Sequence, residues 1–350
     1  MYQILIDNVF SKIIPEPSED IVFLIDQELS FMAEGYFYAP SYKNHYWDGR
    51  IRLYKKRYST FPTGLYSRVI NVFKMLNIGV ETVDMRVVPT LGEPYQCNLT
   101  LRDYQKEVVQ TMIDCGRGTV KVATRGGKSI IIADFISKTN VPTLIIVPKL
   151  SLLAQFHRDL GIWLNTEIGK IGDGICDPKR ITIATMQSLV GAYGKRYKCK
   201  NHDEVVTHTP GKCAKCQSKL QEELTSEYNE ERKEKIRYVV DSVETLIVDE
   251  CHHAVADTLQ FLGDKAKNSF FKFGFSATPR HDTDDDILVE MFTGKQIVDI
   301  GATALIEKGW LSKPTIEMYE VKHEKVIDEI GLDGKKKKLK YATIYEKEIV

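Results

Sequence analysis

The sequence predicts an α/β protein with a parallel sheet covered by helices on both faces. Between about residues 99 and 300, short apolar and β-branched runs alternate with helical stretches, which is typical of such a sheet. Two of these runs lead directly into motifs with phosphate-binding and metal-binding chemistry. The expected strands are Val120–Thr124, Thr143–Val147, Ile181–Ala184, Thr245–Val248 and Lys272–Phe275.

The sequence on either side of this region divides into further segments. Residues 1–95 mix short strands with one amphipathic helix, Leu65–Leu76, and predict a small α+β N-terminal domain. Residues 96–300 form the sheet domain, which an insertion at 194–238 interrupts. Residues 301–350 begin another segment.

The composition limits which partners the protein can bind and where in the cell we expect it. The chain has 350 residues, of which 43% are hydrophobic, and 48 Lys and Arg balance 48 Asp and Glu. Nucleic-acid affinity must therefore come from local patches. No apolar run approaches the ~18 residues that cross a bilayer, and the first residues lack a signal-peptide pattern. We therefore expect a soluble, cytoplasmic protein without a membrane partner.

A pair of carboxylates ends one buried strand. Thr245–Val248 leads straight into Asp249-Glu250-Cys251-His252. Walker B magnesium sites are built in this way. We expect Asp249 to hold Mg²⁺ and Glu250 to orient and deprotonate an attacking water. The alternative is a pair that only solvates the strand end.

A phosphate-binding loop is predicted at the end of an earlier strand. Arg125-Gly126-Gly127 reads as a turn, and Lys128-Ser129 opens an apolar helix. Backbone amides in this turn would cradle phosphate oxygens, Lys128 would contact the β and γ phosphates, and Ser129 would share Mg²⁺ with Asp249. Arg125 departs from the usual glycine, and a positive φ would strain it unless Gly126 takes up the strain.

Taken in order, these motifs resemble those of superfamily 2 helicases. Three further tracts are similar to phage branch-migration helicases of the UvsW type: Trp47–Arg50, Phe61–Leu65 and Leu305–Leu311. The matching helicase tracts are Leu101–Gln105 (adenine recognition), Ala123–Ser129 (motif I), Val147–Gln155 (motif Ia), Ala184–Leu189 (DNA contact), Asp249–His252 (motif II) and Ser276–Arg280 (motif III).

The resemblance implies a RecA-like ATPase fold and gives roles to single residues. It implies that Gln105 reads the adenine edge, although Gln105 could instead cap the helix that follows it. It also implies that His252 links the nucleotide state to Ser276 and Thr278. The other residues that it places at the nucleotide are Arg102, Thr124 and Arg125, and those that it places on the DNA backbone are Pro148, Lys149, Thr185 and Gln187.

The insertion carries the spacing of a structural zinc site. Cys199, His202, Cys213 and Cys216 offer four soft ligands on two short turns, which suits tetrahedral zinc. Because the insertion has no other source of a core, the metal would supply its folding energy. His208 could replace His202, and the alternative is a metal-free surface loop. We expect the other cysteines to be buried or half-buried thiols: Cys97, Cys115, Cys176 and Cys251.

Aromatic and basic residues are mixed between Tyr42 and Tyr58. Aromatic rings stack on exposed bases and cations neutralise phosphates, so Trp47, Arg50 and Arg52 are candidates for single-stranded or junction DNA. The alternative is a twisted hairpin with aromatic cross-strand pairs. A second basic run, Lys335–Lys340, is more typical of a solvated loop.

The resemblance implies an ATP-dependent DNA helicase or translocase that acts on branched or forked DNA. Two alternatives remain: a duplex translocase subunit of a restriction system, and a nucleic-acid-binding module with a degenerate ATPase. In this family a second RecA-like lobe supplies an arginine to the γ-phosphate, but no arginine follows Arg280. We therefore expect the second lobe to be incomplete, so that the chain alone is weakly active.

Overall fold

A computed structural model describes most of the chain. Residues Met1–Leu311 form one compact unit and Ser312–Val350 form another. The described residues are 1–33, 35–193, 197–199, 206–207, 216, 218, 221–222, 227–253, 256–277, 286–313, 328–330 and 336–338.

An eight-stranded sheet forms the centre of the larger domain, with the strand order β10-β9-β11-β8-β15-β16-β7-β17. Neighbouring strands are parallel except for β9 and β10. The strands are β7 (Arg117–Val122), β8 (Thr143–Val147), β9 (Ile168–Gly172), β10 (Ile175–Asp177), β11 (Ile181–Thr185), β15 (Thr245–Asp249), β16 (Phe271–Ser276) and β17 (Gln296–Ile300).

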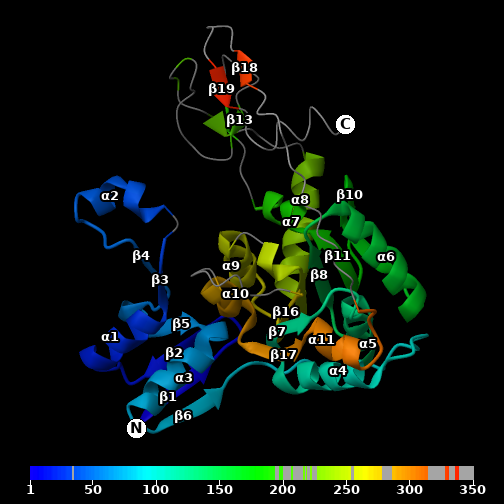
Figure 1. Ribbon diagram of the computed structural model, residues 1–350, viewed down its shortest axis with the longest axis horizontal. Coiled ribbons are helices and arrows are strands. Elements are labelled where there is room, and N and C mark those ends of the chain that lie inside the picture. The colour runs from blue at the N-terminus through cyan, green and yellow to red at the C-terminus, as the bar shows by residue number, and fades with distance from the viewer. Residues whose placement is uncertain are drawn as a thin grey trace. The chain divides into compact units, whose positions relative to one another are not determined.

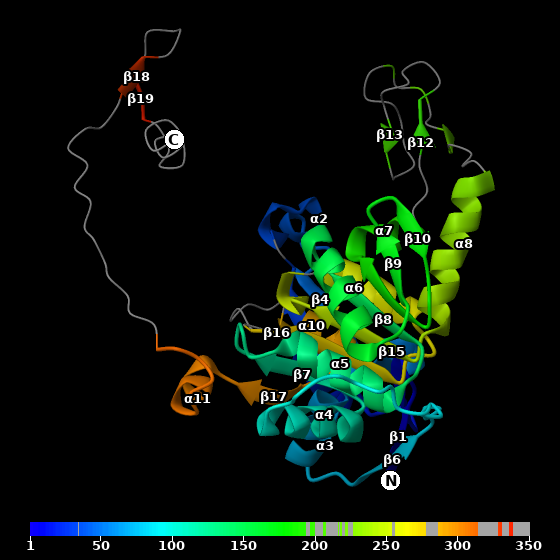
Figure 2. The same cartoon turned by 90° about the vertical axis from the view of Figure 1, so that its right-hand side faces the viewer.

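Helices cover both faces of this sheet, as the α/β pattern predicted (Figure 1). Alternate residues of β8 show why: Ile145 and Val147 join one apolar cluster, whereas Leu144 and Ile146 join another. Helices α4, α5 and α6 pack on the first cluster, and α7, α8 and α9 on the second (Figures 1 and 2). The helices are α4 (Asp103–Cys115), α5 (Lys128–Thr139), α6 (Leu150–Leu164), α7 (Met186–Gly191), α8 (Glu227–Ser242), α9 (Ala256–Lys265), α10 (Asp286–Thr293) and α11 (Ala302–Glu307).

Helix α8 begins inside the insertion expected at 194–238 but belongs to the sheet domain. Its second half buries Ile236, Val239 and Val240 in the second cluster. The insertion proper contributes a three-stranded sheet of β12 (Tyr197–Lys198), β13 (Val206–Thr207) and β14 (Gln221–Glu222). No helix of the described residues could span a membrane.

The N-terminal domain has the predicted α+β character. Its four-stranded sheet has the order β5-β2-β1-β6, and the predicted amphipathic helix is present as α3. The elements are β1 (Tyr2–Ile6), β2 (Phe10–Ile14), α1 (Glu19–Glu28), β3 (Ser30–Met32), η1 (Tyr36–Tyr38), α2 (Pro40–Lys43), β4 (Arg50–Arg52), η2 (Lys56–Tyr58), β5 (Thr60–Pro62), η3 (Thr63–Leu65), α3 (Tyr66–Met75) and β6 (Val80–Asp84).

In the second unit, β18 (Asp328–Ile330) and β19 (Lys336–Lys338) form an antiparallel pair. The expected solvated loop at Lys335–Lys340 is therefore wrong for the three residues of β19. In the register of this pair, Glu329 lies opposite Lys337.

The N-terminal domain docks on α10 of the sheet domain. Leu288 and Met291 join the apolar cluster of the N-terminal domain, and Arg68 Nε lies 2.8 Å from Glu290 Oε2. Gly64 allows the closest approach, because a Cβ there would lie 2.2 Å from the carbonyl oxygen of Glu290 and 2.3 Å from that of Met291. Only glycine fits this backbone contact.

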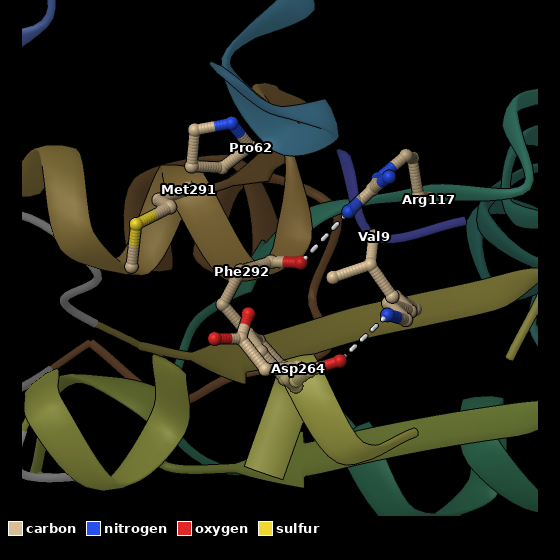
Figure 3. A pocket seen from close by; sticks show the side chains of 8 residues that line it. Val9, Pro62, Arg117, Asp264, Met291 and Phe292 are labelled. Carbon is tan, nitrogen blue, oxygen red and sulfur yellow. Dashed lines mark hydrogen bonds between the residues drawn. The ribbon is translucent and has the colours of Figure 1, made fainter. Parts of the chain in front are cut away.

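A buried lysine joins the two domains at a second point. Lys272 on β16 is 2% exposed, and its ammonium donates to the carbonyl oxygens of Asn8 at 3.2 Å and Gly263 at 3.3 Å. It borders a cavity of about 20 Å³ that Asp264 and Arg117 also line (Figure 3). Burial, together with the nearby Arg117 cation, lowers the pKa of Lys272 to about 7.

We predict that Gly64→Ala loosens the docking of the N-terminal domain. The added methyl group collides with backbone rather than with a flexible side chain, so the free energy of unfolding should fall by about 1–3 kcal/mol. Gly79→Ala is the matched control, because nothing lies within 4 Å of its added Cβ. Urea denaturation of both variants measures the difference. Equal stability of the two would contradict the close contact.

We also predict a pH dependence that belongs to Lys272. Its folded pKa lies below the unfolded value of 10.5, so the unfolded chain binds more protons between about pH 7 and pH 10. The free energy of unfolding of the wild type, relative to Lys272→Met, should therefore rise with pH there, by at most about 1.4 kcal/mol per pH unit. Urea melts at pH 7, 8 and 9 test this, and parallel pH profiles would exclude it.

Candidate nucleotide-binding site

Three neighbouring strands end at one edge of the sheet and carry the predicted motifs. Strand β16 pairs in parallel with both β7 and β15. Because carboxyl ends of parallel strands meet at the same edge, the loop after Val122, the carboxylates at Asp249 and Glu250, and Ser276 come together. The strand order therefore brings the loop after Val122 together with two motifs that lie more than a hundred residues later in the sequence.

The loop between β7 and α5 has the backbone strain that the sequence suggested. Arg125 adopts a φ of 66° and Gly127 a φ of 83°. Gly126 does not take up a left-handed conformation, so the alternative expectation for it is wrong. An exposed arginine at positive φ costs about 1–2 kcal/mol. The loop must therefore be held in place by its neighbours.

Two side chains of α4 hold this loop. The carbonyl oxygen of Gly126 accepts hydrogen bonds from Tyr104 Oη at 2.5 Å and Gln105 Nε2 at 3.2 Å. Gln105 Oε1 also accepts the backbone N–H of Arg102 at 2.9 Å, which caps α4. The capping role of Gln105 is thus present, whereas its reading of an adenine edge stays a prediction.

Lys128 lies where it faces both carboxylates. It is the first residue of α5, and its ammonium pairs with Glu250 Oε1 and lies 3.8 Å from Asp249 Oδ1. The side chain of Lys128 is 14% exposed. The cation is thus held in a largely dry position at the N-terminus of a helix, where anions bind well.

Asp249 has the features of a metal ligand. The residue is 5% exposed, and no hydrogen-bond donor of the described residues reaches its Oδ1 atom. Burial raises the pKa of Asp249 to about 6, against the opposing effect of Lys128. A buried carboxylate oxygen without a donor is costly unless a cation binds it. The donor set therefore fits Mg²⁺, with Ser129 in the adjacent first turn of α5.

Glu250 and His252 connect the carboxylates to β16. Glu250 adopts a φ of 49°, and its Oε2 lies 3.5 Å from His252 Nδ1. His252 Nδ1 lies 2.6 Å from Ser276 Oγ, so the contact expected between motifs II and III is present. Thr278, the second expected partner, lies outside the described residues.

The four residues matched to DNA-backbone contacts lie at or just after the ends of β8 and β11, two other strands of the same sheet. Lys149 and Gln187 are exposed, and Pro148 is half-buried. Thr185 is buried, and its hydroxyl caps α7 by accepting the Ser188 backbone N–H at 3.4 Å. Thr185 therefore has a structural role, and a DNA contact of its side chain stays a prediction.

The candidates in the N-terminal domain are engaged within the protein. Arg52 Nε lies 2.7 Å from Asp26 Oδ2, and its guanidinium also pairs with Asp48. Trp47 is half-buried and donates its indole N–H to the Arg50 carbonyl oxygen at 2.9 Å. These contacts favour a structural role for Arg52 and Trp47. The DNA contacts of Trp47, Arg50 and Arg52 stay predictions.

Two of the four expected zinc ligands are described. Cys199 is buried, and its sulfur lies 3.5 Å from that of Cys216. His202, Cys213 and the alternative ligand His208 lie outside the described residues. No group of three metal-binding side chains occurs among the described residues. Of the remaining cysteines, Cys115 is exposed, which corrects the expectation of a buried or half-buried thiol.

The sequence marked the Leu305–Leu311 tract as helicase-like but did not place it beside the loop. Leu305 of α11 packs with Tyr104 and Ala123, and a Cβ on Gly126 would lie 3.1 Å from Leu305 Cδ1. Trp310 lies over the Arg102 guanidinium, 4.4 Å from the ring centre. The apolar spacing of Leu305, Trp310 and Leu311 was a signal, but their packing partners are about 200 residues away.

Comparison with known proteins gives one curated relative and two solved structures of note. The DNA 3'-5' translocase XPB2 of Sulfurisphaera tokodaii is 31% identical over 153 residues, which are 43% of this chain and 32% of that protein. The chain thus spans about a third of this relative. The UvsW helicase from bacteriophage T4 superposes with a TM-score of 0.61 at 20% identity, over 84% of this chain and 98% of that chain.

A second structure of T4 UvsW gives a TM-score of 0.60 at 20% identity, over 84% of this chain and 56% of that chain. At this identity the likeness establishes the shared fold. Residues 5–80 match the family model of the N-terminal domain of the DNA helicase UvsW. Residues 98–281, more than half of the chain, match the model described as type III restriction enzyme, res subunit. The chain therefore belongs to the res subunit family of type III restriction enzymes, within superfamily 2 of the helicases.

Proposed function

We propose that the protein couples ATP hydrolysis to movement on DNA, as a helicase or translocase that acts on branched DNA. The observation that carries the proposal is the meeting of Lys128, Asp249 and the His252–Ser276 pair at one sheet edge. A phosphate contact, a metal ligand and a link to a neighbouring strand are the parts that nucleotide-driven motion needs. The family membership supports the same conclusion.

The pairing of Lys128 with Glu250 gives these two residues a shared task. While the ammonium pairs with Glu250, the carboxylate is held in an ion pair and is turned to Lys128 instead of to an attacking water. A γ-phosphate in the loop would compete for the Lys128 ammonium and release Glu250 to act as the base. Bound Mg²⁺, held by Asp249 and Ser129, would supply charge neutralisation at the phosphates.

His252 would couple this change in the partner of Lys128 to the parts of the protein that bind DNA. It lies 3.5 Å from Glu250 and 2.6 Å from Ser276, so a movement of the Glu250 carboxylate changes the contacts of both. Ser276 ends β16, the strand whose Lys272 reaches the N-terminal domain. Through His252, Ser276 and β16, a change at the phosphates would thus reach the domain that resembles the UvsW N-terminus.

Branched DNA is the proposed substrate because residues 5–80 match the N-terminal domain of UvsW, a DNA helicase. The name of the matched res subunit family favours a second candidate, a duplex translocase of a restriction system. The strained Arg125 favours a third, a DNA-binding module with a weak ATPase. Assays of ATP hydrolysis and strand separation on Holliday, forked and linear DNA distinguish the three.

We further propose that full turnover needs an arginine from a second RecA-like lobe. Among the described residues at the site, Arg125 and Arg102 are the arginines beside the loop, and Arg102 is stacked on Trp310. A finger arginine is worth about 10³–10⁵ in turnover. Residues 1–350 alone should then bind ATP and DNA but hydrolyse slowly.

The zinc site is also part of the proposal. Two thiolates on one tetrahedral zinc, each about 2.3 Å from the metal, lie roughly 3.8 Å apart. The 3.5 Å separation of the Cys199 and Cys216 sulfurs is close to this value and far from the ~2.05 Å of a disulfide. The zinc would organise the insertion through Cys199, His202, Cys213 and Cys216.

We predict that Lys128→Ala and Glu250→Gln fail in different ways. Lys128→Ala should lose ATP binding and turnover, since it removes the phosphate contact. Glu250→Gln should bind ATP nearly as well as the wild type but hydrolyse it at least about 100-fold more slowly, because an amide cannot act as the base. Equilibrium binding of a fluorescent ATP analogue and phosphate release measure both. Undiminished hydrolysis by Glu250→Gln would rule Glu250 out as the base.

We also predict one zinc per chain. Elemental analysis of protein purified without chelator should find it, and Cys213→Ser should lose it. Cys115→Ser is the matched control, because Cys115 is an exposed thiol outside the proposed site. Metal content near zero in the wild type would disprove the zinc site and leave the proposed ATPase untouched.

A further inference from the structure

An excursion from the N-terminal domain carries aromatic residues at its far end. The excursion runs from β3 to β4, and Figure 1 shows α2 beyond these two strands, away from the N-terminal sheet. We name Phe37, Tyr38 and Tyr46 the aromatic tip. They are 50%, 72% and 87% exposed. No residue of η1 or α2 is buried, so these rings serve no core.

The base of the excursion is held together by strand pairing and by a close contact of Tyr36. Strands β3 and β4 pair from Ser30 to Arg52, and the Ala33 backbone N–H donates to the Gly49 carbonyl oxygen at 2.8 Å. Gly49 has a φ of 82°, and a Cβ there would lie 2.7 Å from the Tyr36 ring. The close packing of Tyr36 thus requires glycine at this position.

The rings support one another at defined geometry. The Tyr36 and Tyr42 rings meet edge to face at 4.8 Å, and the Phe37 and Tyr38 ring centres lie 4.3 Å apart. Such pairs are worth about 0.5–1.5 kcal/mol beyond area burial. Tyr36 and Tyr42 therefore act as a support, which leaves faces of the aromatic tip open to solvent.

The cation beside the tip is Lys43. The other Lys and Arg of residues 36–58 include Lys55, which lies over the Phe10 ring of β2, and Lys56, which lies 3.8 Å from Asp26 of α1, and the acidic residue of this stretch is Asp48. That carboxylate is already paired with Arg52. Lys43, in α2 next to the tip, is exposed. Open aromatic faces beside the exposed Lys43 suit unpaired nucleic-acid bases with their phosphates, since every base can stack and every phosphate is anionic.

We propose that the aromatic tip stacks on unpaired bases of DNA, at the point where a branched substrate opens. The inference rests on the proposed function for the DNA substrate, but it assigns a different surface from the Trp47, Arg50 and Arg52 set. Trp47 and Arg52 have internal partners. Phe37, Tyr38 and Tyr46 supply the stacking faces, and Lys43 supplies charge.

The test compares single-stranded and duplex DNA. The variant Phe37→Ala/Tyr38→Ala/Tyr46→Ala should bind a 20-nucleotide oligothymidylate and a forked DNA at least about tenfold more weakly than the wild type, because each lost stack removes affinity. Its affinity for a blunt 20-base-pair duplex should stay within about twofold. Tyr38→Phe/Tyr46→Phe keeps the rings and should retain the affinity. Phe23→Ala is the matched control, an exposed ring on α1 that is 60% exposed.

Several outcomes would overturn the inference. Oligothymidylate affinity within twofold of the wild type removes the tip as a base contact. An equal loss on the blunt duplex assigns the tip to duplex binding instead. A wild-type dimer in sedimentation that the variant loses means that a second copy of the chain covers the tip.

The same experiment separates this inference from the proposed function. If the wild type binds forked DNA and hydrolyses ATP while the tip variant matches it in both, only the inference fails. If the wild type binds no DNA, the proposed function fails first and the inference falls with it. Because none of the three rings is buried in a core, the variant should still fold, and a cooperative thermal melt of the variant shows that a loss of affinity is not a loss of folding.

Discussion

One buried carboxylate constrains the whole candidate site. Asp249 ends a strand that is buried along its entire length, and its pKa is raised because its surroundings are dry. An ionised group in that position needs a compensating cation, which Lys128 supplies from the loop after β7, two strands away in the sheet, and a metal ion fits the open oxygen. The strand order, the positive φ values in the loop and the start of α5 at Lys128 together place positive charge next to the Asp249 carboxylate.

The fold was largely predictable because its strands are unusual in composition. Strands β8, β11 and β15 are buried on both faces, so they read as continuous apolar and β-branched runs. Strand β9 was missed because it contains two glycines. A Cβ on Gly169 would lie 2.4 Å from the Lys179 backbone nitrogen. Glycine is therefore required here by a close backbone approach, which strand propensity does not reflect.

The site was predictable only where chemistry is local in sequence. Lys128 and Asp249 were found because each sits in a short motif at a strand end. The pairing of Arg52 with Asp26 could not be read from composition, because the two lie 26 positions apart. The same holds for the loop contacts of Leu305 and for the Lys272 bond to Asn8, which spans 264 positions. Tertiary contacts of this length leave no periodic signal.

The hydrogen bonds of the Lys272 ammonium also limit which parts of the protein can be separated from each other. One of the two carbonyl oxygens that hold its ammonium belongs to the N-terminal domain, and Met291 of α10 packs into that domain's apolar cluster. Removing residues 1–95 would strip a partner from a buried cation and uncover an apolar helix face. The two domains are therefore not interchangeable modules: transplanting either into another protein would require redesign of β16 and α10.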